Sequence, residues 1–123
     1  MRTRMLIVTL LPLAIATGCG QNRTVSFQSD VTPILKKNCY ECHTNDGDGY
    51  KKSGLSMENY ETLMKGTKFG PVVVPGNSVS STLARLVQGK ASPEINMPHK
   101  RDALPEAEAK VIVQWIGQGA KNN

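Results

Sequence analysis

The residues best suited to chemistry are five consecutive positions, from Cys39 to His43, which read Cys-Tyr-Glu-Cys-His. Two thiols at this spacing can reach the two vinyl groups on one side of a porphyrin, and the adjacent imidazole can then project to its iron. Imidazole suits iron, and the pattern is the attachment motif of c-type haem. The motif predicts one covalent haem c, bound through Cys39 and Cys42, with His43 as an axial iron ligand.

Three other uses of this motif remain open. A structural zinc site needs four ligands, and outside the motif only His99 remains as a good donor. A thiol-disulfide redox motif accompanies a βαβ pattern, which this sequence lacks. The two cysteines could also form a plain disulfide in an exported protein. Haem is favoured because the motif agrees with the helical pattern and the export signal described below.

The ligand on the opposite face of the iron has two candidates, Met97 and His99. Met97 lies in a loop between Asn96 and Pro98 and could offer a thioether to the iron. His99, two residues further on, would give bis-histidine ligation instead. We favour Met97 as the distal ligand. Met57 and Met64 lie on a helical apolar stripe, which is typical of core packing.

The first 18 residues resemble the signal peptide of a bacterial lipoprotein. Two arginines precede an apolar run over residues 5–16, which is shorter than the about 20 residues that a spanning helix needs. A glycine then precedes the lone Cys19, although Ala16 stands where leucine is usual. We expect residues 1–18 to be removed, Cys19 to be lipidated and residues 19–26 to form a tether. The alternative is an ordinary cleaved signal peptide that leaves Cys19 spare.

Charge and composition exclude some classes of partner. The formal net charge is +5, but no run of Lys and Arg is longer than two residues, and only 5% of residues are aromatic. Without a basic stripe or stacking aromatics, no nucleic-acid binding is expected. A small domain also buries a limited fraction of its surface. A buried haem would supply cohesion that so small a core lacks.

Apolar periodicity predicts an all-α domain over residues 27–123, with about four helices and long loops. No segment keeps the alternation of a β-strand. The expected helices cover residues 27–39, 57–64, 79–87 and 105–117, and the expected loops cover residues 44–54 and 90–103. The expected N-caps are Ser29 or Asp30 for the first helix, Ser56 for the second, and Asn77 or Ser78 for the third. Pro33 and Pro105 suit the first turns of the first and last helices.

The order of these motifs resembles the planctomycete-type cytochrome c domains over residues 27–120. The segments that carry the resemblance are Phe27 to Leu35, Cys39 to His43, Gly54 to Met57, Tyr60 to Gly66, Val74 to Ser78, Ser81 to Leu83, Met97-Pro98 and Gln114 to Ala120. Two positions depart from the family's usual pattern. His99 follows Pro98 where a second proline is common, and Leu104 stands where a polar helix cap is usual.

The resemblance implies a small class I-like cytochrome c fold around one haem. In the family, the two cysteines bind haem, the motif histidine is the proximal ligand and the methionine is the distal ligand. These roles fall on Cys39, Cys42, His43 and Met97.

We therefore expect an electron carrier, not an enzyme, that exchanges electrons with redox protein partners. It would be anchored to a membrane by lipid at Cys19 and face the periplasm, and Gly20 is compatible with the outer membrane. The alternatives are a haem enzyme subunit or a gas or redox sensor with a labile or non-methionine sixth ligand, and then a non-haem thiol or zinc module.

Overall fold

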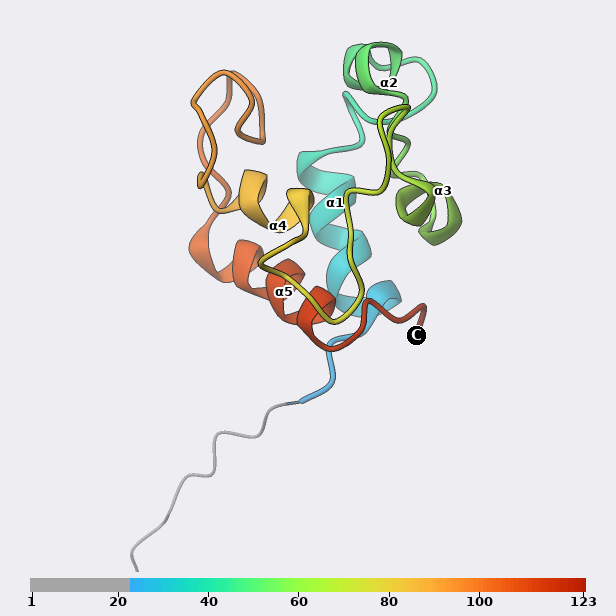
Figure 1. Cartoon of the computed structure of the whole chain (residues 1–123), viewed down its shortest axis with the longest axis vertical. Coiled ribbons are helices and arrows are strands. Elements are labelled where there is room, and N and C mark those ends of the chain that lie inside the picture. Colours follow the sequence, from blue (N-terminus) through green and yellow to red (C-terminus); the bar gives the residue numbers. More distant parts are fainter. Residues whose placement is uncertain (1–22) are drawn as a thin grey trace, which may run out of the picture.

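The structure is a computed structural model that describes residues 23–123 (Figure 1). The predicted signal peptide, the lipidation site Cys19 and the start of the predicted tether lie outside these residues. The elements in chain order are η1 (Phe27–Val31, a π-helix), α1 (Thr32–Asn38), α2 (Asp48–Ser53), α3 (Tyr60–Lys65), α4 (Thr82–Val87) and α5 (Glu106–Gly117). Within residues 23–123 there is no strand, only an isolated bridge between Thr67 and Gly70. The predicted all-α fold class is confirmed.

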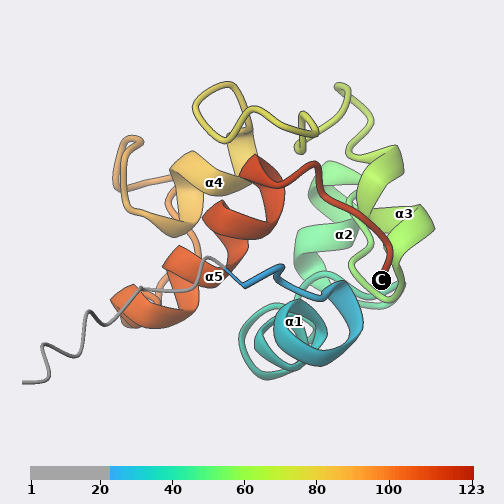
Figure 2. The same ribbon diagram turned by 90° about the horizontal axis from the view of Figure 1, so that it is seen from below.

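The two ends of the described chain meet at one end of the molecule. The η1 element packs against both α1 and α5, and α4 packs against α5. Seen from below, the segment after α5 crosses the molecule to the side of α3 (Figure 2). There the Tyr60 hydroxyl donates to the Ala120 carbonyl at 2.9 Å. The backbone amide of Gln28 donates to the backbone oxygen of Asn123 at 3.0 Å. The terminal segments are thus joined through both packing and hydrogen bonds.

The first predicted helix is present as the continuous pair η1 and α1. Its N-cap is Ser26, whose hydroxyl accepts from the Ser29 amide at 3.1 Å, so the predicted caps Ser29 and Asp30 were wrong. Asp30 instead accepts from the Ser26 amide at 2.8 Å, which satisfies a second free donor of the first turn. Pro33 lies in the first turn of α1, but because η1 precedes α1 without a break, it is not in the first turn of the whole helix as predicted.

The helix α2 was not predicted, because residues 44–54 were expected to form a loop. None of its residues is buried, so it carries no apolar stripe that periodicity could reveal. It is held by backbone geometry: Gly54 ends it in the left-handed region at φ 76°, and its amide donates to Tyr50. The acidic Asp48 at its start and the two lysines in its last turn also suit the helix dipole.

Two predicted helix starts were misplaced. Asn59, not Ser56, caps α3 in a reciprocal capping box with Thr62. The α4 helix begins at Thr82 after Ser81, whereas Asn77 accepts from the Ser80 amide in a separate turn. Val79, predicted to belong to the buried face of α4, is 83% exposed because it lies in that turn. The helix itself buries Leu83, Ala84 and Val87.

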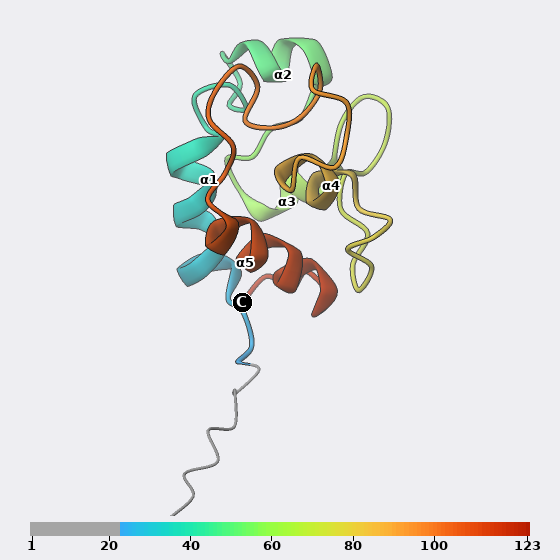
Figure 3. The same ribbon diagram turned by 90° about the vertical axis from the view of Figure 1, so that its left-hand side faces the viewer.

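The core lies between η1, α1, α3, α4 and α5. Its largest fully buried side chains are Trp115, Leu35, Leu63, Ile112, Ile116 and Val31. Met57 is also buried, at 3% exposure, in agreement with the predicted packing role. At the opposite end of the molecule stand α2 and the loop between α4 and α5 (Figures 1 and 3). None of the described helices is long and apolar enough to cross a membrane.

Candidate haem site

The turn after α1 brings Cys39, Cys42 and His43 together. Cys39 caps the end of α1, and its amide donates to the Leu35 carbonyl at 2.8 Å. The amides of Cys42 and His43 both donate to the Cys39 carbonyl, at 3.1 and 2.9 Å. Cys39 is half-buried against the core and Cys42 is exposed, and both carry free thiols. The motif is therefore a tight turn with two free thiols beside one imidazole.

His43 is held in the form that binds a metal. His43 is 7% exposed, and its Nδ1 lies 3.2 Å from the Leu55 carbonyl oxygen. Because a carbonyl only accepts, Nδ1 carries the proton and Nε2 keeps its lone pair. Burial lowers the pKa of His43, although the bond to Leu55 opposes this shift. A neutral imidazole with an oriented ring is what iron ligation requires.

The start of α2 closes against this imidazole. The Tyr50 amide donates to the Cys42 carbonyl at 2.8 Å. A Cβ atom at Gly49 would lie 2.9 Å from Cε1 and 3.0 Å from Nε2 of His43, and one at Gly47 would clash with the Cys42 backbone. Both positions therefore require glycine. No role was predicted for Gly47 and Gly49 from the sequence, although two glycines so soon after the motif could have indicated a close backbone approach.

The environment of Cys39 fits a thioether better than a thiolate. Burial, followed by the nearby Cys42 and Glu108, raises the pKa of the Cys39 thiol to about 11. Thiol redox chemistry and zinc binding both use the thiolate, which this environment disfavours, whereas a thioether does not ionise. In the part of the chain that the structure describes, no group of three or more His, Cys, Asp or Glu residues could hold a metal ion.

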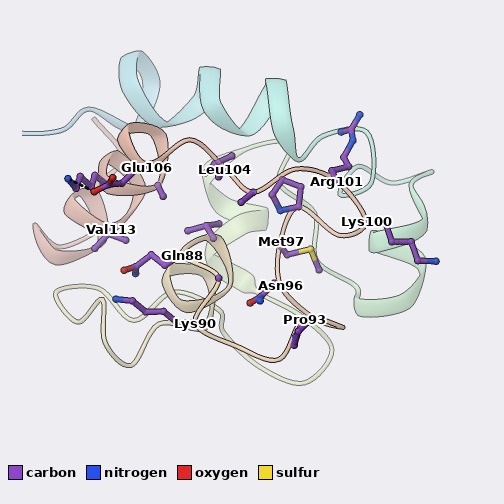
Figure 4. Close-up of a pocket in the computed structure, with 16 residues that line it drawn as sticks. Gln88, Lys90, Pro93, Asn96, Met97, Lys100, Arg101, Leu104, Glu106 and Val113 are labelled. Carbon is purple, nitrogen blue, oxygen red and sulfur yellow. Dashed lines mark ion pairs between the residues drawn. The ribbon is translucent and has the colours of Figure 1, made fainter.

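Met97 lies in the wall of a cavity of about 600 Å³ between α4, α5 and the loop over residues 88–104 (Figure 4). The cavity combines apolar side chains with several basic ones. Its apolar walls include Val87, Leu104, Ala109 and Val113, and its basic side chains are Lys90, Lys100, Arg101 and Lys110. In Figure 4 the Met97 side chain points away from Val113 and Glu106 at the far end. The thioether is thus half-buried at one end of the cavity.

The two parts of the candidate site are not joined in one cavity. Cys39, Cys42 and His43 do not line the cavity that contains Met97. His99, the rival distal ligand, does not line it either and is exposed. The loop and the motif are instead connected by an ion pair, in which Arg101 Nη2 lies 2.8 Å from Glu41 Oε2.

A family model for planctomycete cytochrome C matches residues 39–100, about half of the chain. The chain belongs to this family, and the resemblance stated from the sequence is confirmed. Membership implies a covalently bound c-type haem, used in electron transfer or in a haem enzyme. Domains of this kind are typically exported.

A likeness to a solved structure supports the fold. A chain of the Kuenenia stuttgartiensis hydrazine synthase is 24% identical to this chain, with a TM-score of 0.54. The match covers 80% of this chain but only 16% of that one, so the likeness shows the fold alone. No curated protein matches.

Proposed function

We propose that the chain is an electron carrier with a single haem, bound through thioethers to Cys39 and Cys42 and ligated at its iron by His43 and Met97. The observation that carries the proposal is the geometry of His43: its Nδ1 lies 3.2 Å from the Leu55 carbonyl oxygen, which leaves Nε2 as the nitrogen for iron, and two free thiols lie in the same turn. When bound, the haem supplies a reversible one-electron iron couple.

The protein's own part is to orient the ligands. The Leu55 carbonyl orients the His43 ring and makes it a better electron-pair donor to iron, as hydrogen-bond acceptors beside ligating histidines do at other metal sites. Gly49 leaves room beside the ring, and the amide of Tyr50 ties α2 to the motif. These contacts would keep the proximal ligand rigid during electron transfer.

Burial supports Met97 as the distal ligand over His99. Met97 is half-buried in the cavity wall, whereas His99 is exposed outside it. A thioether is weakly solvated and is buried at little cost, whereas an imidazole in this loop would lose water if it were buried. Methionine ligation would also raise the potential of the haem iron.

Absorbance of the mature, purified protein tests the assignment. We expect c-type haem bands in wild type and the weak far-red sulfur-to-iron band in the oxidised form. Met97→Ala should abolish the far-red band, and the control His99→Ala should keep it. A mature protein without haem bands would reject the carrier, and a far-red band that survives in Met97→Ala would reject Met97 as ligand.

A haem enzyme subunit is the second candidate. The cavity beside Met97 favours it, because a space of about 600 Å³ could admit a small substrate if the thioether leaves the iron. Carbon monoxide distinguishes the two functions. Rapid binding to the reduced wild-type protein would favour the enzyme or a sensor, and slow binding that becomes fast in Met97→Ala would favour the carrier.

Export and lipid anchoring rest on residues 1–19, which the structure does not describe, and they stay part of this proposal. A lipid at Cys19 would hold the carrier at the periplasmic face of a membrane, where it could reach redox partners. Intact mass after detergent extraction provides the test. A mature chain that begins at a diacylated Cys19 is expected, and an unmodified Cys19 or another first residue would reject the anchor.

A further inference from the structure

One ion pair connects the Met97 loop to the haem-attachment motif. Glu41 is one of the two residues between Cys39 and Cys42, and Arg101 follows Met97 by four positions. Arg101 Nη2 lies 2.8 Å from Glu41 Oε2. The pair therefore joins the two segments that carry the proposed iron ligands, which are distant in sequence.

The rest of the loop has few polar links to the molecule. Asn96 exchanges two hydrogen bonds with Ala91, at 3.1 Å each, but both residues belong to the loop itself. The Met97 amide donates to the Leu86 carbonyl at 3.3 Å, a long bond. Over residues 98–103 the described structure gives no other hydrogen bond or ion pair than that of Arg101 with Glu41.

We infer that Arg101 is a positioning residue: its ion pair with Glu41 holds the Met97 loop closed against the haem-attachment motif and so disfavours the replacement of Met97 by other iron ligands. The inference rests on the proposed ligation by His43 and Met97. The role of Glu41 would be particular to this chain, because the two residues between the cysteines do not bind haem and can carry any side chain.

The expected effect is modest because both partners are partly solvated. The side chain of Arg101 is 50% exposed and that of Glu41 is 71% exposed. Exposed ion pairs shift an equilibrium by about two- to five-fold, and high salt removes most of that effect. An external ligand must compete with the closed loop, so its apparent affinity should rise by the same factor when the pair is lost.

The test measures imidazole binding to the oxidised, haem-loaded protein. We expect Arg101→Ala and Glu41→Gln each to raise the imidazole affinity about two- to five-fold at low salt. Near 1 M salt the difference from wild type should vanish. The double variant Glu41→Arg/Arg101→Glu exchanges the two charges and can re-form the pair, so it should restore the imidazole affinity of the wild type. The matched control is Lys100→Ala, which removes a neighbouring cation that forms no ion pair within the described chain and should change the affinity less.

The outcomes separate this inference from the proposed function. If wild type has the far-red band and Met97→Ala binds imidazole tightly, but Arg101→Ala behaves like Lys100→Ala, the positioning role is wrong and the His43/Met97 ligation stands. An Arg101→Ala effect that persists at high salt also overturns it. If Met97→Ala binds imidazole no better than wild type, the ligation itself fails and the inference fails with it.

Discussion

The end of the molecule where η1 meets α5 and the end formed by α2 and the Met97 loop are held together by different forces. At the first end, Phe27, Tyr60 and Trp115 form an aromatic cluster with ring centroids 5.2 to 6.4 Å apart. Phe27 is 3% exposed and Trp115 is 1% exposed. We call this end the aromatic base. Its stability comes from apolar burial, reinforced by hydrogen bonds to the C-terminal segment.

The other end, the ligand end, consists of α2 and residues 88–104. None of the residues of α2 is buried, and Ile95 in the loop is 54% exposed. Only Leu104, at the end of the loop, enters the core, with 7% exposure. This end depends on backbone hydrogen bonds, one ion pair and, in our proposal, the iron ligands. This difference in burial predicts that the aromatic base is the more stable of the two ends.

Trp115→Ala should show the largest effect, because it removes the centre of the aromatic base. Replacing a fully buried tryptophan leaves a cavity and costs about 3–5 kcal/mol in the free energy of unfolding. Guanidinium unfolding provides the measurement. The matched control is Phe69→Ala, since Phe69 is 84% exposed and its loss should change the free energy by less than about 0.5 kcal/mol. Equal losses of unfolding free energy in the two variants would contradict the conclusion that apolar burial stabilises the aromatic base.

Asn96→Ala should loosen the ligand end and leave the aromatic base intact. The side chain makes two hydrogen bonds to Ala91, and their loss should cost about 1–2 kcal/mol. Because the bonds lie within one loop, the cost should appear as local opening. Amide hydrogen exchange should therefore speed up in residues 91–97 and stay unchanged around Trp115. A uniform loss of protection across the chain would show that the two ends are not separable.

Tyr60→Phe should weaken the aromatic base slightly. The variant keeps the ring against Phe27 and loses only the bond from the hydroxyl to the Ala120 carbonyl, 2.9 Å long. A single neutral hydrogen bond is worth about 1 kcal/mol. Thermal unfolding should show a lower midpoint than wild type, with unchanged haem absorbance. A changed haem spectrum would mean that the base and the ligand end are coupled.

The sequence predicted the parts of the fold whose signal is periodic burial. The stretch from Phe27 to Asn38 and the helix α5 each bury a regular stripe, and both were found. The α2 helix was missed because it buries nothing, and the start of α4 was misplaced because Val79 is apolar but exposed in a turn. Apolar periodicity predicts a helix only where apolar residues are buried. It therefore fails for a helix that buries nothing and for an apolar residue that is exposed.

The candidate site divides in the same way. Cys39, Cys42 and His43 could be found because their chemistry depends on spacing along the chain. The contacts of Leu55 with His43 and of Arg101 with Glu41 could not, because only the fold brings these residues together. Leu104 illustrates the opposite case: it lacks the polar side chain expected at a cap, and the structure places it in the core.

Glu108 should give the smallest effect, and it tests whether charges contribute to the contact between α1 and α5 outside the aromatic base. Its carboxylate accepts from Lys37 Nζ at 2.7 Å and from Asn38 Nδ2 at 2.8 Å, which links α5 to α1 beside Cys39. The bond from Lys37 lowers the pKa of Glu108 below its usual value of 4.5. The folded state therefore binds the proton less readily than the unfolded state, so the contribution is present above the unfolded pKa and disappears as the pH falls through the folded pKa. Because Lys37 is 65% exposed, we expect it to amount to a few tenths of a kcal/mol.

The variant Glu108→Gln keeps a hydrogen-bond acceptor at this position but has no carboxyl group that can bind or release a proton. Unfolding free energies of wild type and variant, measured from about pH 6 to about pH 3, should differ at the upper end and converge at the lower end. Asp30 and Glu106 also have lowered pKa values, but they titrate in both proteins and cancel in the difference. A difference that stays constant over this range would assign the effect of Glu108 to packing. A difference as large as that of Trp115→Ala would mean that this charged contact between α1 and α5 stabilises the fold as much as the aromatic core does.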